Sequence, residues 1–117
     1  MRAIKIDVVK KGVYEVDIPV EAVLDSLYKE LECDTVTAVY VEPDETLWLD
    51  DEGLLREPPL GAFRAGTQVY SGHGIILGTD PDGESVATKL KVSDIYNTVR
   101  FVDPSELPEP TMTFISL

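Results

Sequence analysis

The feature that most constrains the fold is an alternation of apolar and polar residues that recurs in short runs along the chain. Within residues 4–8, aliphatic side chains alternate with Lys5 and Asp7. A period of two is that of a β-strand with one buried face, because successive side chains of a strand point to opposite faces. The run reaches residues 10–12, which include a glycine, and alternation resumes over residues 13–18. The sequence therefore predicts a β-hairpin at the start of the domain.

One change of period marks a helix. Asp17 and Pro19 are typical of a helix start, and apolar residues then recur at spacings of three and four over residues 20–31. The opposite side of this segment is mostly charged. We expect an amphipathic helix that covers one face of the sheet, with an apolar stripe made of Val20, Val23, Leu24, Leu27 and Leu31.

The middle of the chain predicts a second hairpin and a long loop. Residues 35–41 are almost all β-branched or aromatic, which is typical of a strand. Residues 46–49 are expected to form the next strand after a short acidic turn. Pro58 and Pro59 suit neither a helix interior nor a central strand, so residues 54–62 are predicted to form the longest loop.

Later residues predict one more hairpin and a short helix. Residues 66–78 have the composition of one strand, interrupted by a glycine-rich bulge. The acidic turn at residues 80–84, with its Asp-Gly pair, leads to an expected strand over residues 85–92. A short helix is predicted over residues 93–102, with Ser93 as its cap.

These elements predict an α+β fold with a mostly antiparallel sheet of five to seven strands, one main helix and a short second helix. Hairpins favour antiparallel pairing, because strict strand–helix–strand alternation is absent. The length of 117 residues fits one domain, which we place at residues 1–103. Residues 104–117 are expected to form a proline-rich extended tail, of which residues 111–117 are apolar enough to dock as an edge strand or to bind a partner.

The cysteine count and the amino terminus indicate a cytoplasmic protein. A single cysteine, Cys33, allows no intramolecular disulfide, which favours a reducing compartment. The first ten residues carry charges at every second or third position, so no signal peptide is expected. No stretch approaches the roughly 20 apolar residues that span a membrane. We expect no membrane partner.

Charge is the outstanding property of the composition. Ten Lys and Arg residues against 22 Asp and Glu residues give a net charge of −12. Direct nucleic-acid binding needs basic clusters, so no direct nucleic-acid partner is expected. Seven of the acids lie between residues 42 and 57, beside a single arginine. They are either solvated turns or a surface that binds a basic groove on another protein. The second interpretation assigns partner binding to Asp44, Glu45, Trp48, Asp50, Asp51, Glu52 and Glu57.

Patterns for metal binding and catalysis are missing from the sequence. One histidine and one cysteine exclude the usual zinc ligand sets. Residues 80–84 resemble the start of a calcium loop, but Lys91 stands at the twelfth position, where a bidentate glutamate is needed. Cys33 lies between Glu32 and Asp34, which disfavour the thiolate. Phosphate-binding loops and nucleophile elbows do not occur. We therefore expect no metal site, no cofactor and no enzymatic activity.

A second hypothesis is the binding of a small molecule. Groups suited to an anion and a stacked base concentrate in the middle of the chain, so a nucleotide or signalling ligand is expected there. His73 lies between two glycines, and its alternative role is that of a turn or bulge residue. The residues assigned to this ligand are Arg56, Arg64, Tyr70 and His73.

Several motifs follow one another between residues 36 and 90. Residues 47–55 carry an Asp-Asp-Glu-Gly turn between apolar residues, followed by two prolines, Ala62, Gly66 and a hairpin with Asp-Gly-Glu. This order resembles a small domain-of-unknown-function family carried by bacteriophages, plasmids and their bacterial hosts. The family tends to have Asn-Arg after the prolines, where this chain has Leu60 and Gly61.

The resemblance implies an accessory protein of a mobile element rather than a reaction. Combined with the acidic excess, it gives our leading hypothesis: a protein that binds a basic host protein in the host cytoplasm. Dense carboxylates can occupy a basic nucleic-acid channel and speed the encounter, so the protein would act as a nucleic-acid mimic or a defence antagonist. A homo-oligomer is a further candidate assembly.

Overall fold

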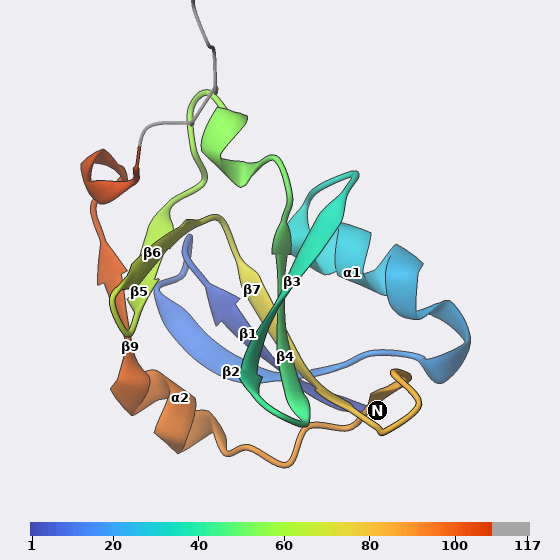
Figure 1. The fold of residues 1–117 in the computed structure, drawn as a ribbon. Helices are drawn as coiled ribbons and strands as arrows, with labels where there is room; N and C mark the ends of the chain where they lie inside the picture. Colours follow the sequence, from blue (N-terminus) through green and yellow to red (C-terminus); the bar gives the residue numbers. More distant parts are fainter. Residues whose placement is uncertain (109–117) are drawn as a thin grey trace, which may run out of the picture.

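The computed structural model describes residues 1–108, which form two α-helices and nine strands, and the strands make two sheets. Figure 1 shows α1 on one face of the main sheet, with the small sheet and α2 on the other side. In chain order the elements are β1 (Arg2–Asp7), β2 (Gly12–Asp17), the 3-10 turn η1 (Val20–Ala22), α1 (Val23–Leu31), β3 (Val36–Glu42), β4 (Glu45–Asp50), η2 (Gly53–Leu55), β5 (Ala62–Ala65), β6 (Gln68–Ser71), β7 (Gly74–Thr79), β8 (Ser85–Val86), α2 (Val92–Thr98), β9 (Val99–Val102) and η3 (Pro104–Glu106).

The predicted α+β class is confirmed. The main sheet has six strands in the order β2-β1-β7-β4-β3, with β8 paired to β7. A second sheet has the order β6-β5-β9. Every strand pair in the two sheets is antiparallel. The sequence predicted one sheet, so the division of the strands between two sheets is a finding of the structure.

The first hairpin forms as predicted, with Ile6 opposite Val13. Its turn differs in detail, because Lys11 adopts the left-handed conformation at φ 55° while Gly12 begins β2. Ile4 and Ile6 of β1 pack into the core between the two sheets. Lys5 and Asp7 lie on the opposite face, which is also buried because α1 covers it.

The main helix starts and ends near the predicted bounds but buries a narrower stripe. Leu27 and Leu31 pack against the main sheet, while Val20 and Leu24 are 71% and 51% exposed. The helix ends at Glu32, whose φ of 56° places it in the left-handed region. The second half of the helix therefore holds it on the main sheet, through Leu27 and Leu31. This contact places Glu32, the residue after Leu31, beside the end of the sheet.

Residues 66–78 form two strands in different sheets, so the prediction of one bulged strand is wrong. β6 belongs to the small sheet and β7 to the centre of the main sheet. Gly72, at φ 85°, makes the change of direction between them, a conformation that glycine adopts without strain. β5 also lies where no strand was predicted, directly after the proline loop.

The end of the described chain partly follows the prediction. The turn at residues 80–84 is confirmed: Asp80 accepts hydrogen bonds from the backbone N–H groups of Asp82 and Glu84. β8 is only two residues long, and the predicted helix gives way to β9 after Thr98. Ser93 does not cap α2, whose N-cap residue is Lys91. The predicted docking of residues 111–117 lies outside the described residues.

Candidate functional site

One end of the main sheet gathers polar and apolar groups around η2. β4 ends at Asp50, whose Oδ1 accepts a hydrogen bond from the Glu52 N–H at 2.9 Å and fixes the turn. η2 then packs closely on β6: a Cβ on Gly53 would lie 2.9 Å from the Ser71 carbonyl oxygen. Glycine at position 53 is thus what allows this approach. The turn leaves four side chains exposed together, which we call the η2 surface: Asp51, Glu52, Leu54 and Leu55.

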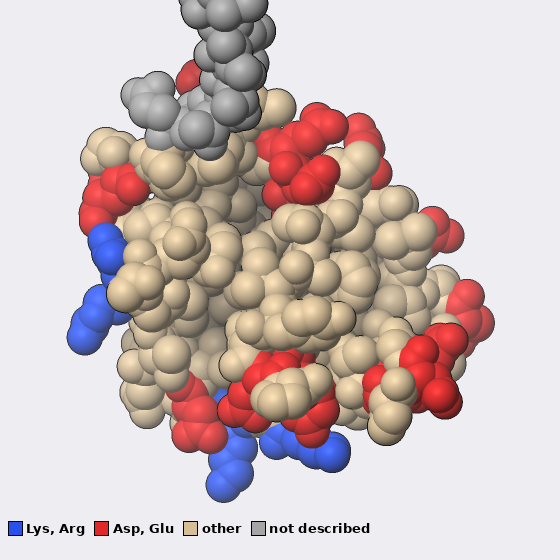
Figure 2. All heavy atoms as spheres, viewed as in Figure 1, with Lys and Arg blue, Asp and Glu red and all other residues tan. Residues whose placement is uncertain are grey.

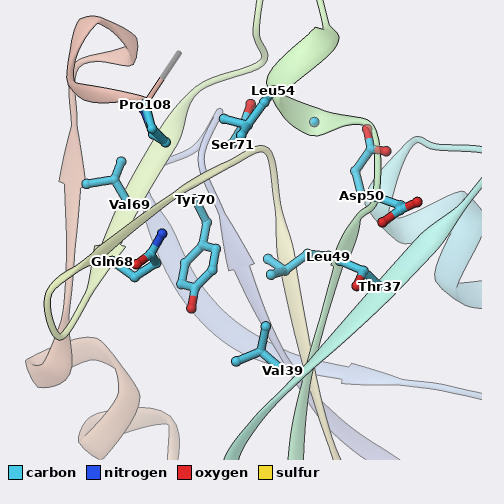
Figure 3. Close-up of a pocket in the computed structure, with 12 residues that line it drawn as sticks. Thr37, Val39, Leu49, Asp50, Leu54, Gln68, Val69, Tyr70, Ser71 and Pro108 are labelled. Atoms are coloured by element: carbon cyan, nitrogen blue, oxygen red, sulfur yellow. The ribbon is translucent and has the colours of Figure 1, made fainter. Parts of the chain in front are cut away.

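The η2 surface borders a groove between the two sheets (Figure 3). This inter-sheet groove has a volume of about 230 Å³. Figure 3 shows the Tyr70 ring lying between β6 and the side chains of Val39 and Leu49. Burial raises the pKa of Tyr70, so its hydroxyl stays protonated near neutral pH and can donate a hydrogen bond. Ser71 also lines the groove, and its buried Oγ has no hydrogen-bond partner within residues 1–108.

A second, polar pocket of about 360 Å³ lies on the other side of η2, at the end of α1. Four carboxylates line it, from Glu32, Asp34, Asp50 and Glu52, together with the guanidinium of Arg56. Arg56 Nη1 donates to the Glu32 carbonyl oxygen at 2.8 Å and lies 3.7 Å from Asp50 Oδ2. The negative excess disfavours an anionic ligand and favours a cationic group.

The predicted anion and base site is not assembled in this structure. Arg64 pairs across the small sheet with Val69, whereas Tyr70 pairs with Phe63, so Arg64 and Tyr70 point to opposite faces. Arg64 Nη2 lies 3.3 Å from a carboxylate oxygen of Glu106. Arg56 borders the acidic pocket instead, so the structure brings no two of these three side chains into a common basic site.

His73 is buried and both of its ring nitrogens are used within the fold. Nδ1 accepts a hydrogen bond from the Val8 N–H at 3.1 Å, which assigns the proton to Nε2. Nε2 lies 3.0 Å from a carboxylate oxygen of Glu32 and donates to it. His73 therefore ties β1 to the end of α1, which agrees with its predicted alternative role as a structural residue at the β6–β7 junction.

A partly buried polar pair, formed by Asp7 and Tyr14, was not predicted from the sequence. The Tyr14 hydroxyl donates to Asp7 Oδ2 at 2.6 Å. Burial would raise the pKa of Asp7, but the Lys10 N–H, the Tyr14 hydroxyl, His73 and the Val9 N–H outweigh it and hold the pKa below its ordinary value. Burial and the Asp7 carboxylate raise the pKa of Tyr14 to about 12. The alternation in β1 predicted that Asp7 lies on an exposed face. It gave no indication that both faces of the sheet are covered, so this pair was missed.

Cys33 carries no signature of a nucleophile. Burial and the nearby Asp50 carboxylate raise the pKa of its thiol to about 11. The thiolate is therefore scarce near neutral pH, and thiolate chemistry is disfavoured.

The predicted partner-binding residues fall into three groups: those near η2, Asp44 at the opposite end of β4, and Glu45 and Trp48 within β4. Asp51, Glu52 and Glu57 are exposed near η2, and Asp50 lies beneath them with its side chain 10% exposed. Asp44 is exposed at the opposite end of β4, where it lies 3.5 Å from Lys89 Nζ. These acids therefore lie in two separate turns, at opposite ends of β4.

Glu45 and Trp48 are corrections to the predicted surface. Glu45 is 1% exposed and accepts hydrogen bonds from the Thr88 hydroxyl and the Lys89 N–H. Trp48 is partly buried against the core under α1, and its Nε1 has no hydrogen-bond partner in the described part of the chain. β4 lies inside the main sheet with both faces covered, so neither side chain is free to meet a partner.

Residues 1–108 lack two features that would bear on the site. No group of three or more His, Cys, Asp or Glu side chains in this part of the chain is arranged to hold a metal ion. No helix within the same residues is long and apolar enough to cross a membrane.

The fold and the site define a small two-sheet α+β domain with an open groove beside an acidic turn. Residues 1–100 match the family described as Domain of unknown function (DUF3846), so the chain belongs to this family. The match confirms the coarser expectation, a domain-of-unknown-function family, and it covers residues 1–100. No curated protein and no solved structure matches the chain.

Proposed function

We propose that this protein acts by binding another protein, and that the η2 surface with the adjoining inter-sheet groove is the binding site. The partner it fits is a segment that presents Lys or Arg next to apolar side chains. The observation that carries the proposal is the placement of Asp51 and Glu52 beside the exposed Leu54 and Leu55, at the mouth of a groove.

The physical case combines two contributions. Leu55 is 61% exposed and Leu54 is 38% exposed, so covering them removes apolar surface from water. Asp51 and Glu52 are exposed and form no ion pair within residues 1–108. They can therefore attract a cationic partner without first losing an internal contact. The acidic pocket on the α1 side continues the negative field next to them.

On the face shown in Figure 2, the distribution of charge favours a local contact over a long negative surface. In the view of Figure 2, Asp and Glu side chains form separate groups around a face that is mostly uncharged. A nucleic-acid mimic would present carboxylates in a continuous row, because it replaces a regular phosphate backbone. We therefore propose docking of one basic segment as the form of interaction.

The resemblance to a family of phages and plasmids supplies a more specific form of the proposal. The partner is then a host protein with a basic surface, met in the host cytoplasm, and binding antagonises the function of that surface. The alternative of a sequestered nucleotide at Arg56 loses support, because that arginine lies among carboxylates.

The test reverses the charge of two acidic residues at either of two places on the protein. A labelled peptide of alternating Lys and Leu is titrated against the wild type, the Asp51→Lys/Glu52→Lys variant and the Asp82→Lys/Glu84→Lys variant. Both variants change the net charge equally, and both pairs are exposed. We expect the η2 variant to bind about tenfold more weakly, which corresponds to about 1.4 kcal/mol. The control variant should differ from the wild type by less than about twofold.

Fluorescence polarisation at low salt gives these affinities, and added salt should weaken wild-type binding. Equal losses in both variants would show that net charge, rather than the η2 surface, attracts the peptide. An η2 variant that binds like the wild type would contradict the proposal.

A further inference from the structure

A third cavity lies between the main sheet and α2, at the end of β4 away from η2. Its volume is about 370 Å³, within the range of small-molecule sites. The floor consists of core residues of three central strands: Ile6, Leu47 and Ile76. Each of these is at most 2% exposed, so the cavity reaches the core of the domain. We call it the α2 cavity.

The walls of the α2 cavity are also apolar. Leu90, Ile95 and Val99 line it from the α2 side, and Ala65 lines it from β5. Water inside such a cavity has few polar partners, whereas an alkyl or aromatic group there replaces the missing packing contacts. The depth and the apolar lining therefore favour a hydrophobic moiety of a small molecule over the flatter surface of a protein partner.

The charged groups that line the α2 cavity are both negative. Glu42 and Asp94 line it and are exposed, and neither carboxylate has an ion pair or hydrogen bond within residues 1–108. Lys89 precedes Leu90 in the chain, but its ammonium group forms an ion pair with Asp44, with Nζ 3.5 Å from the carboxylate, and not with Glu42 or Asp94. Thr98 adds a hydroxyl that donates to the Asp94 carbonyl oxygen. These carboxylates complement an ammonium group at the end of an apolar ligand.

We propose that the α2 cavity is a binding site for a small cationic amphiphile. The apolar part of the ligand enters between the main sheet and α2, and its ammonium group meets Glu42 and Asp94. The site shares no residue with the η2 surface, so the inference stands independently of the proposed function.

Calorimetric titration with primary alkylamines of increasing length, and with alcohols of the same lengths, tests the chemistry. Each added methylene should tighten binding about fourfold while the cavity has room, since burying one is worth about 0.8 kcal/mol. Each amine should bind about tenfold more tightly than its alcohol, because a hydrogen bond to a charged group is stronger. In the Glu42→Gln/Asp94→Asn variant, we expect amine binding to fall to the level of the alcohol, with alcohol binding unchanged.

Filling the cavity tests its location. Ala65→Leu places a larger side chain into the α2 cavity and should weaken both ligand series more than tenfold. Ala38→Leu adds the same atoms on exposed β3, outside the cavity, and should leave binding unchanged. If Ala65→Leu lacks the circular dichroism of the folded protein, Ala65→Val is used instead. Absence of binding by either series overturns the site, equal affinity for amine and alcohol overturns the cation preference, and unchanged binding in the filled variant overturns the location.

Discussion

Replacing Phe63 by alanine should lower the free energy of unfolding by about 3–5 kcal/mol. Phe63 is fully buried, and its ring centroid lies 5.4 Å from that of Tyr70. Its ring also fills the space above Gly74, where an added Cβ would lie 3.2 Å from the Phe63 Cζ. One side chain thus joins the small sheet to the main sheet, and its removal leaves a cavity between them.

Urea unfolding of the wild type and the variant measures this effect. A loss of this size is a large part of the 5–15 kcal/mol that typically stabilises a domain, so Phe63→Leu provides a milder companion. We expect the leucine variant to lose less than half as much, because it keeps most of the apolar volume. A loss under about 1 kcal/mol in the alanine variant would mean that the sheets do not pack through Phe63.

Replacing Glu45 by alanine should destabilise the protein by about 2–4 kcal/mol. Glu45 is buried in β4, where it accepts hydrogen bonds from the Thr88 hydroxyl and the Lys89 N–H. Its removal leaves these donors without their acceptor and opens space in the interior, and each unsatisfied buried group costs about 1–3 kcal/mol. The contact fixes the segment between β8 and α2 to the main sheet.

Asp44→Ala is the matched control for Glu45. The two acids are adjacent in sequence, but the Asp44 side chain is exposed and makes a surface ion pair with Lys89. We expect its loss to change stability by less than about 0.5 kcal/mol. Equal effects of the two substitutions in thermal and urea unfolding would argue against the structural role of Glu45.

The sequence predicted the elements whose signals are local. The period-two runs of the first hairpin, the helical spacing before Leu31 and the Asp-Gly turn each reflect contacts between residues close in the chain, and all three form. The α+β class follows from their order. The exposed placement of Asp51 and Glu52 was also predictable, because turns after strands lie at the surface.

The missed features depend on which strands become neighbours. β5 is a four-residue strand stabilised by pairing with β6 and β9, and its own sequence gives little indication of it. Glu45 and His73 look like surface or turn residues until their distant partners, Thr88 and Val8, come into contact. Long-range packing also covers Trp48, because α1 lies against the face of the sheet that carries this side chain. A single sequence does not encode such contacts in a readable local pattern.

The most direct test of the η2 surface as a binding site is to map the bound peptide on the protein. Nitrogen-15-labelled protein is titrated with the unlabelled Lys-Leu peptide, and the backbone amide shifts are followed by NMR. Binding at the η2 surface predicts the largest changes at residues 51–55, with smaller changes at Thr37, Gln68 and Tyr70 along the groove. Shifts that are largest at the acidic turn of residues 80–84, or spread evenly over all exposed carboxylates, would contradict it.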